Sequence, residues 1–433
     1  MKIWLIAALV CVASTGAAAQ ERARAFIGAR ILPITAPEIE NGTLLIEGGR
    51  IVAVGPADQV AVPDGAERID VRGKTIMPGL VDTHSHIAGP SGGDASAPLQ
   101  AETRVLDAID VRASSVRRAQ AGGITTANVM PGSGHLLSGQ TLYLKLRGGG
   151  TVDDFLIRLS DGRIAGGVKM ANGTNSIRTG GGAFPGTRAR SAALARAYFL
   201  KAQDYREKLR KAGDDPDKRP PRDLAMEALV DVLEGRRVVH FHTHRHDDIL
   251  TVIRLAQEFN FRPVLQHVSE GWRVADAIAK SGLPASIIMI DSPGGKLEAV
   301  HLSFRTGAAL EQAGVLVGLH TDDPITDSRL LLRSAGMAVR GGMSREGALR
   351  AVTIANAKML GLDDRIGSLE PGKDADFIVL SGDPLSVYTH VEQTWVEGRK
   401  VFDRSDPKDR LYATGGYGAS RGEVFDLIEE ELQ

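Results

Sequence analysis

The sequence has almost no cysteine, and this limits the chemistry it can perform. Cys11 is the single cysteine among 433 residues, and it lies in the apolar segment at the N-terminus. The chain beyond that segment therefore has no thiol for a disulfide. Any metal site must use His, Asp, Glu or a modified Lys as ligands.

An excess of charge of one sign is also missing. The chain has 52 Lys and Arg residues against 53 Asp and Glu residues, and aromatic residues make up only 5%. No basic surface favours nucleic acid, and no acidic one favours cationic partners. The 50 glycines suit an enzyme rich in loops. The expected partner is a small-molecule substrate, and association with further copies of the chain is left open.

The first 19 residues have the pattern of a cleaved signal peptide. Lys2 supplies a positive start, residues 3–13 form an apolar run, and Ala17-Ala18-Ala19 offers small residues for cleavage before Gln20. The run is too short to span a bilayer, although a buried N-terminal strand is an alternative. The pattern predicts a periplasmic or secreted protein with no membrane attachment after cleavage.

Strand and helix signals divide the rest of the chain. Residues 20–77 and 362–404 contain short apolar runs between Gly, Pro and Asp turns, which are typical of a small β domain. Residues 78–361 alternate strands with helices, the pattern of a parallel (β/α)8 barrel of the TIM type, so the fold class is α/β. Residues 405–433 form a polar tail with an acidic helix expected at 423–432. The expected barrel strands after the first are 123–129, 142–146, 167–170, 237–242, 263–267, 285–290 and 314–320, and the expected helices include 100–121, 189–212 and 223–234.

The first barrel strand ends in two histidines. Side chains alternate along a strand, so His84 and His86 lie on the same face. Two neutral imidazoles placed in this way can hold one divalent metal. Such a pair also occurs as solvated or core histidines, but the surrounding turn residues and the histidines downstream favour a metal site.

Further histidines fall where other strands end. Seven of the 11 histidines do so, and Asp322 follows the eighth strand. Active sites of such barrels lie at the carboxyl ends of the strands, so these side chains should meet on one rim. The seven are His84, His86, His240, His242, His244, His267 and His320.

Three phrases of the sequence resemble the amidohydrolase superfamily. Pro78-Gly79-Leu80-Val81-Asp82-Thr83-His84-Ser85-His86 resembles the signature that opens its barrel, and Leu369-Glu370-Pro371-Gly372-Lys373-Asp374-Ala375-Asp376 resembles a phrase of its β domain. His242-Thr243-His244-Arg245 resembles the imidazolonepropionase-like and prolidase-like branches. The resemblance covers residues 24 to about 404. It implies a β-sandwich built from both chain ends around the barrel.

The resemblance also implies a ligand set for two metals. His84, His86, Asp322 and a carboxylated Lys169 would hold one metal, while Lys169, His242 and His267 would hold the second. Asp323 is the alternative to Asp322, and Lys169 is alternatively a substrate-binding or surface lysine. His240 is expected to support the site or to belong to the core. Zinc is the expected metal because the site is rich in nitrogen, with manganese and iron as alternatives.

The implied reaction is hydrolysis of an amide, a cyclic amide or a dipeptide-like substrate. A hydroxide bridging the metals would attack the carbonyl, and Asp322 would carry its proton to the leaving nitrogen. His244 and Arg245 would lie near the substrate, unless they form a solvated loop. The other candidate contacts to substrate are Asn128, His135, Gln140, Asn172 and Asn175.

Two other functions remain open from the sequence. A mononuclear deaminase or cyclic-imine hydrolase would use one metal, but members of that kind carry His-x-x-Glu at the fifth strand, where this chain has Arg245. A non-catalytic periplasmic binding protein would keep the barrel and lose ligands. The intact ligand set argues against it.

We expect the mature chain to begin near Gln20, because signal peptidase cleaves after small residues such as Ala17 and Ala19. N-terminal sequencing of protein from a periplasmic extract checks this. Recovery of an intact Met1 from the soluble cell fraction would rule out export.

Overall fold

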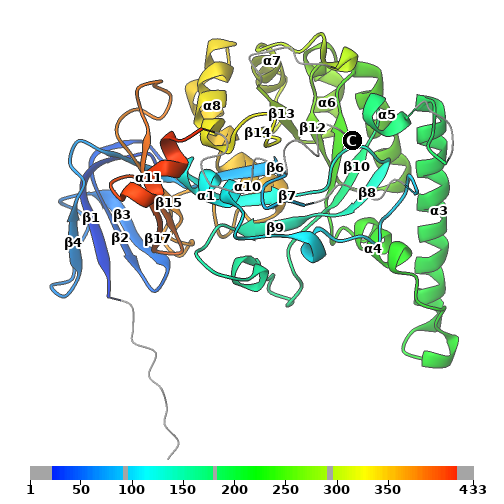
Figure 1. The fold of residues 1–433 in the computed structure, drawn as a ribbon, viewed down its shortest axis with the longest axis horizontal. Helices are drawn as coiled ribbons and strands as arrows, with labels where there is room; N and C mark the ends of the chain where they lie inside the picture. The colour runs from blue at the N-terminus through cyan, green and yellow to red at the C-terminus, as the bar shows by residue number, and fades with distance from the viewer. Residues whose placement is uncertain (1–21, 91–95, 179–182, 290–295, 417–433) are drawn as a thin grey trace, which may run out of the picture.

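The computed structural model describes residues 22–90, 96–178, 183–289 and 296–416. The predicted signal peptide and the predicted acidic helix at 423–432 lie outside these residues. Figure 1 shows the two parts of the fold, a β-rich part that contains both ends of the described chain and a larger part in which helices surround strands.

The β-rich part is an eight-stranded sheet to which both ends of the chain contribute. Its order is β17-β16-β15-β5-β1-β2-β3, with β4 paired to β1. In Figure 1 the blue N-terminal strands and the orange C-terminal strands lie together in it. The strands are β1 (Arg24–Ile31), β2 (Ile39–Glu47), β3 (Arg50–Pro56), β4 (Glu67–Asp70), β5 (Thr75–Pro78), β15 (Phe377–Leu380), β16 (Val391–Val396) and β17 (Arg399–Asp403).

Aromatic packing holds the two contributions together. The Phe26 ring of β1 meets Phe377 and Trp395 edge to face, with centroid distances of 4.8 and 5.1 Å. Such pairs add about 0.5–1.5 kcal/mol beyond the burial of their surface. The N-terminal strands therefore depend on residues more than 300 positions away.

The larger part is built on two further sheets. Their orders are β14-β13-β12-β11-β10-β8 and β6-β7-β9. The strands are β6 (Leu80–Ser85), β7 (Ile124–Val129), β8 (Leu137–Gln140), β9 (Leu142–Lys145), β10 (Val168–Ala171), β11 (Val239–Thr243), β12 (Pro263–His267), β13 (Ala285–Ile288) and β14 (Val317–His320).

The pairings link these strands in a cycle. β8 and β9 are separated only by Thr141 and pair with β10 and β7, respectively. At the other junction, the Asp322 amide donates to the His84 carbonyl at 2.9 Å, and the His86 amide donates to the Asp323 carbonyl at 3.1 Å. The end of β14 is thereby held against the end of β6.

The prediction that all of these strands are parallel is wrong for the third. β9 runs antiparallel to β7, and β8 runs antiparallel to β10. A parallel pair needs a crossover of a dozen or more residues, usually a helix, whereas residues 130–136 between β7 and β8 are too few. The apolar run at 142–146 correctly indicated a strand but carried no information on its direction.

Helices cover the outside of this cycle. The predicted helices at 189–212 and 223–234 are present as α3 (Arg188–Ala212) and α4 (Leu224–Leu233). The one expected over 100–121 is only α1 (Ser114–Ala121), because Ile109 is extended and ends a short 3-10 turn. The others are α2 (Thr174–Ile177), α5 (His246–Phe259), α6 (Ala275–Ser281), α7 (Thr306–Gln312), α8 (Leu331–Arg340), α9 (Arg345–Ala351), α10 (Ile354–Leu360) and α11 (Pro407–Thr414).

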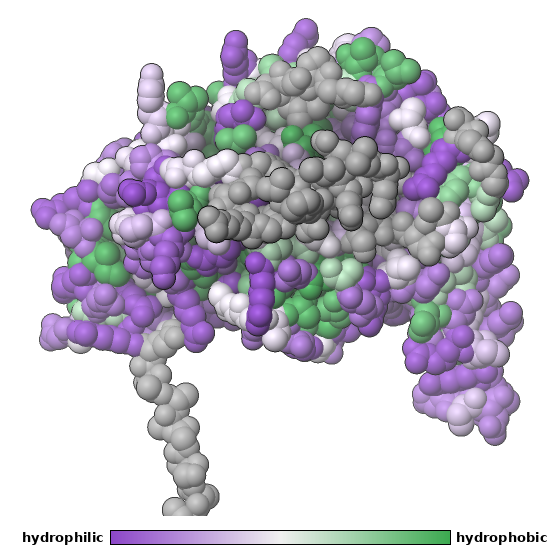
Figure 2. Space-filling model, viewed as in Figure 1, coloured by the Kyte–Doolittle hydropathy of each residue, from purple (hydrophilic) through white to green (hydrophobic). Residues whose placement is uncertain are grey.

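The C-terminal end of α3 projects beyond the rest of the larger part (Figure 1). Its surface in Figure 2 is almost entirely hydrophilic. Across the described ranges, no helix is both long and apolar enough to cross a membrane.

A buried ionic cluster joins the two parts. Nζ of Lys145, at the end of β9, donates to Asp374 and Asp376 at 2.6 Å each. The Lys145 side chain is 1% exposed, and those of the two carboxylates are nearly as buried. Arg365 adds a further cation 3.0 Å from Asp374. Two buried carboxylates close together are tolerated only while these cations remain.

We expect Lys145→Met to destabilise the chain by about 3–5 kcal/mol, because it leaves buried carboxylates without their main partner. Lys218→Met is the matched control, since Lys218 forms an exposed pair with Asp215 at 2.8 Å; such pairs contribute about 0–1 kcal/mol. Denaturant unfolding followed by circular dichroism measures both. Equal midpoints for the two variants would contradict the assigned role of Lys145.

Candidate metal centre

Three groups of potential metal ligands lie at the carboxyl ends of the strand cycle. In each group the ligand atoms lie within 4.8 Å of one another. We call His84, His86 and Asp322 the aspartate cluster, and His242, His244 and His267 the histidine cluster. His84, His267 and His320 form the third group, which lies between them.

The aspartate cluster is assembled by the junction of β6 and β14. Oδ1 of Asp322 lies 3.2 Å from Nε2 of His84 and 3.0 Å from Nε2 of His86. Nδ1 of His86 lies 2.7 Å from the Met130 carbonyl, which fixes the orientation of that ring. The structure thus brings together the ring nitrogens of His84 and His86 and a carboxylate oxygen of Asp322.

The histidine cluster comes from β11, the residue after it and the end of β12. The His242 ring centroid lies 4.4 Å from that of His267, and the His244 ring stacks on His267 at 4.8 Å. Nδ1 of His244 is held 2.7 Å from Oγ of Ser269. His244, predicted as a substrate contact, is therefore placed with the ligands.

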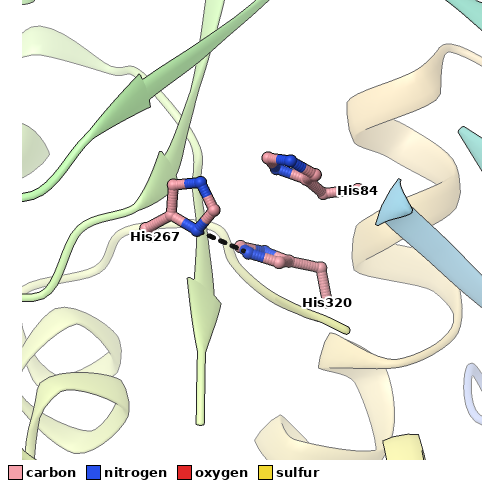
Figure 3. A group of neighbouring side chains, drawn as sticks. All are labelled: His84, His267 and His320. Atoms are coloured by element: carbon pink, nitrogen blue, oxygen red, sulfur yellow. Dashed lines mark hydrogen bonds between the residues drawn. The ribbon is translucent and has the colours of Figure 1, made fainter. Parts of the chain in front are cut away.

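His320 contacts one histidine of each cluster, His84 and His267 (Figure 3). Its Nε2 lies 3.1 Å from Nδ1 of His267, and its Nδ1 lies 2.8 Å from Oγ of Ser286. The His84 ring stacks on it at 5.0 Å. With Nδ1 of His267 engaged in this way, its Nε2 is the nitrogen left to bind a metal.

Lys169 reaches the same place from β10. It is fully buried, and its Nζ lies 2.9 Å from Nε2 of His84. Burial lowers the pKa of Lys169 to about 7, because the charged ammonium is poorly solvated there. A large fraction of this lysine is therefore a neutral amine near neutral pH.

Burial also keeps the imidazoles neutral. It lowers the pKa of His84, His242, His244 and His267 well below the usual histidine value. Burial would raise the pKa of Asp322, but His84 and His267 beside it, with the hydrogen bonds from His84 and His86, hold that pKa well below its ordinary value. Neutral imidazoles with an ionised carboxylate are the state that binds a divalent ion.

The backbone is constrained where the ligands sit. His267 has φ of 72° and Asp322 has φ of 54°, both in the left-handed region that non-glycine residues rarely adopt. Asp82 stabilises the left-handed backbone at Asp322, since its carboxylate accepts hydrogen bonds from the amide and hydroxyl of Thr321. Burial raises the pKa of Asp82 to about 7. Strained ligand positions of this kind cluster at functional sites.

These residues fit a divalent metal. Nε2 of His242, His244 and His267 are buried, and none has a hydrogen-bond partner among the described residues. Buried polar atoms without partners cost free energy, and the three unpartnered nitrogens of the histidine cluster are explained together by a bound cation.

Other predicted residues have structural partners. His240 lies 2.9 Å from the Tyr143 hydroxyl and 3.1 Å from the Gln266 amide, which agrees with a core or supporting role. Gln140 donates to the Ala101 carbonyl at 3.1 Å. Arg245 lies before α5 and forms a pair with Asp247 at 2.9 Å.

The remaining candidates lie in β7 or in the segments that follow β7 and β10. The Asn128 amide donates to the Thr83 carbonyl at 3.0 Å, and the Asn172 amide donates to the Asp248 carbonyl at 3.0 Å. Asn175 donates to Ser133 at 2.6 Å. The buried His135 ring packs 5.5 Å from Phe184.

Sequence analysis missed one acidic residue at the site. Glu298 is buried, and its Oε1 lies 3.7 Å from Nε2 of His242. It sits in a 3-10 turn, Leu297–Ala299, after β13, where no recognisable phrase marks it. The signal that the sequence offers is an acidic residue in the segment that follows β13.

Comparisons with known proteins agree with this geometry. Residues 273–402 match the model of the amidohydrolase family. The chain is 27% identical to amidohydrolase tasK of Hapsidospora irregularis over 84% of its own length and 40% of that protein, so it spans well under half of that relative. It is 26% identical to the imidazolonepropionase of Caulobacter vibrioides over 79% of this chain and 88% of that one.

A solved structure gives the family. An amidohydrolase from Thermotoga maritima MSB8 is 34% identical, aligns over 88% of this chain and 100% of that one, and has a TM-score of 0.82. The fold is thus the mixed α/β fold of these enzymes. The chain is an enzyme of the amidohydrolase superfamily, and the relatives that it matches are named as amidohydrolases, deaminases and imidazolonepropionases.

Proposed function

We propose that the chain hydrolyses a C–N bond of an amide, a cyclic amide or a dipeptide-like substrate, using two divalent ions. The observation that carries the proposal is the pair of ligand clusters, each with its ligand atoms within 4.8 Å of one another, in one buried site. Bound there, the ions would supply an activated water and polarise the substrate carbonyl. Zinc suits the nitrogen-rich ligands best.

The proposed architecture is a (β/α)8 barrel at residues 78–361, with a β-sandwich from residues 20–77 and 362–404. The cycle of strand pairings supports the barrel, with β8 and β9 together as its third, antiparallel strand. Because both clusters lie at the carboxyl ends of the parallel strands, the site has the position usual for such barrels.

Lys169 is the proposed bridge between the ions. Its neutral amine would attack carbon dioxide, form an N–C bond and release a proton, which leaves a carbamate anion. That anion replaces a potential cation 2.9 Å from Nε2 of His84, where a positive charge would oppose metal binding. The low pKa of about 7 supports this, because only the neutral amine reacts.

Asp322 is the proposed proton carrier. Its Oδ1 is shared by His84 and His86, while its Oδ2 lies 3.9 Å from Nδ1 of His267, so the carboxylate faces both clusters. From this position it would take a proton from the attacking water and return it to the leaving nitrogen. The imidazolonepropionase relative supports a cyclic amide as one member of the substrate class.

One observation favours a mononuclear alternative, a deaminase or cyclic-imine hydrolase. Lys169 contacts the aspartate cluster through His84. The three ligands of that cluster already suffice to hold one ion. The number of bound metals decides between the two functions.

We expect Asp322→Asn to retain much of the metal and to lose roughly 10²–10⁴-fold in turnover, because an amide keeps a coordinating oxygen but accepts no proton. Steady-state kinetics with a panel of N-acyl amino acids, dipeptides and cyclic amides, together with metal analysis, tests this.

Asp323→Asn is the control for that variant. Asp323 accepts hydrogen bonds from the amide and hydroxyl of Ser328 at 2.7 Å each, so its loss should affect stability more than turnover. An inactive Asp323 variant beside an Asp322 variant with wild-type turnover would show that the proton carrier is misassigned.

We expect elemental analysis to find close to two metals in the wild type and fewer in Lys169→Ala, with loss of activity. Short carboxylic acids should restore part of both, because they can occupy the place of the carbamate. A fully active wild type with a single metal would contradict the bridged site and support the mononuclear alternative.

A further inference from the structure

Glu298 is a buried carboxylate that the proposed reaction does not use. Only 2% of its surface is exposed, and its Oε1 has no hydrogen-bond partner among the described residues. Nε2 of His242, 3.7 Å away, is also without a partner. Burying an ionised carboxylate without a compensating positive charge costs free energy. The facing atoms Oε1 of Glu298 and Nε2 of His242 therefore indicate a place for a cation between them.

The other oxygen of Glu298 is held in place. Oε2 accepts a hydrogen bond from the Thr174 amide at 2.7 Å, and Nη2 of Arg188 lies 3.9 Å from it. Arg188 is itself committed to Asp248, which it contacts at 2.9 Å. The carboxylate is thus anchored on one side and presents its free oxygen to the histidine cluster.

The loop after β10 leaves room for this carboxylate. Gly173 has φ of 79°, and a Cβ at that position would lie 2.3 Å from Oε2 of Glu298. A side chain there would collide with the carboxylate, and an L-residue would be strained at this φ in any case. Gly173 therefore lets the acidic residue from the loop after β13 approach the end of the strand that carries Lys169.

We propose that Glu298 is a protein ligand of the metal ion at the histidine cluster. Nε2 of His242, His244 and His267 and Oε1 of Glu298 are four buried atoms without hydrogen-bond partners among the described residues. Oε1 of Glu298 lies 3.7 Å from Nε2 of His242 and outside the group of three histidines whose ligand atoms are within 4.8 Å of one another. It would therefore reach a divalent ion such as Zn²⁺, held by the three histidines, from the side of His242. The inference rests on the second metal of the proposed function. It assigns that metal two ligands, His244 and Glu298, beyond His242, His267 and the Lys169 carbamate.

The assignment also accounts for a feature of the fifth strand. Arg245 follows β11, and its side chain is paired with Asp247. In this chain a carboxylate reaches His242 from the other direction, from the loop between β13 and α7.

The test is metal binding by the full chain. The protein is stripped with a chelator, reloaded with Zn²⁺ against a competing chromophoric chelator, and loaded separately with Co²⁺ for visible absorption. Loss of an outer partner of a ligand costs roughly 10–100-fold in metal affinity. Glu298→Gln keeps a coordinating oxygen but loses the negative charge, so the variant should still load with metal in excess Zn²⁺. It should bind one of the two ions more weakly by at least that factor, bind the other as the wild type does, and show an altered Co²⁺ spectrum.

Glu270→Gln is the matched control. Glu270 is also buried, but its carboxylate holds His246 at 2.6 Å on the outer side of the site, so both affinities should stay as in the wild type. Gly173→Ala keeps Glu298 but forces its carboxylate away, and it should weaken the same ion as Glu298→Gln. This second variant keeps the test decisive if Glu298→Gln folds poorly.

Wild-type affinities and an unchanged Co²⁺ spectrum in both Glu298→Gln and Gly173→Ala would overturn the assignment, whatever the activity of the enzyme. A wild type that binds a single ion would instead overturn the two-metal function. In that case the assignment stands if Glu298→Gln weakens the single ion and falls if it does not.

Discussion

Two backbone hydrogen bonds at the junction of β6 and β14 position the ligands on which the metal centre depends. They join His84 to Asp322 and His86 to Asp323, and so connect a strand near residue 80 to one near residue 320. Without this junction His84 and His86 would lie on an unpaired strand edge, apart from the carboxylate of Asp322. The left-handed turn at Asp322 and the hydrogen bonds from Thr321 to Asp82 then fix the direction of the carboxylate.

The centre is chemically unusual because it buries many weak bases and few acids. Seven imidazoles lie in or directly below it, with Asp322 and Glu298 as the carboxylates that contact them. Four of these rings leave one nitrogen without a hydrogen-bond partner among the described residues, namely those of His84, His242, His244 and His267. The same low polarity that depresses the histidine pKa values makes the site favourable for a dication, whose charge is then shared among several neutral donors.

Much of this could be predicted from the sequence because the relevant signals are local. His84, His86, His242 and His267 follow apolar runs, and a strand end fixes which way a side chain points, so their convergence follows from the fold class. Glu298 could not be found in this way, because its position depends on a loop path and on the space above Gly173. The direction of the third strand was missed for a related reason. Periodicity identifies β9 but does not say whether its neighbours run with it or against it.

The shared sheet has a consequence for how the chain reaches its native state. β5 lies between β1 and β15, so residues 75–78 find one neighbour nearby in the sequence and the other only at residues 377–380. During synthesis the N-terminal strands must wait, with an unpaired edge, until the last strands emerge. Such an edge is a template for pairing with other chains, and contacts this distant slow folding. A truncation near residue 370 would therefore leave an intact set of metal ligands on a chain prone to aggregate, and the amount of soluble enzyme would depend on how quickly the C-terminal strands are delivered.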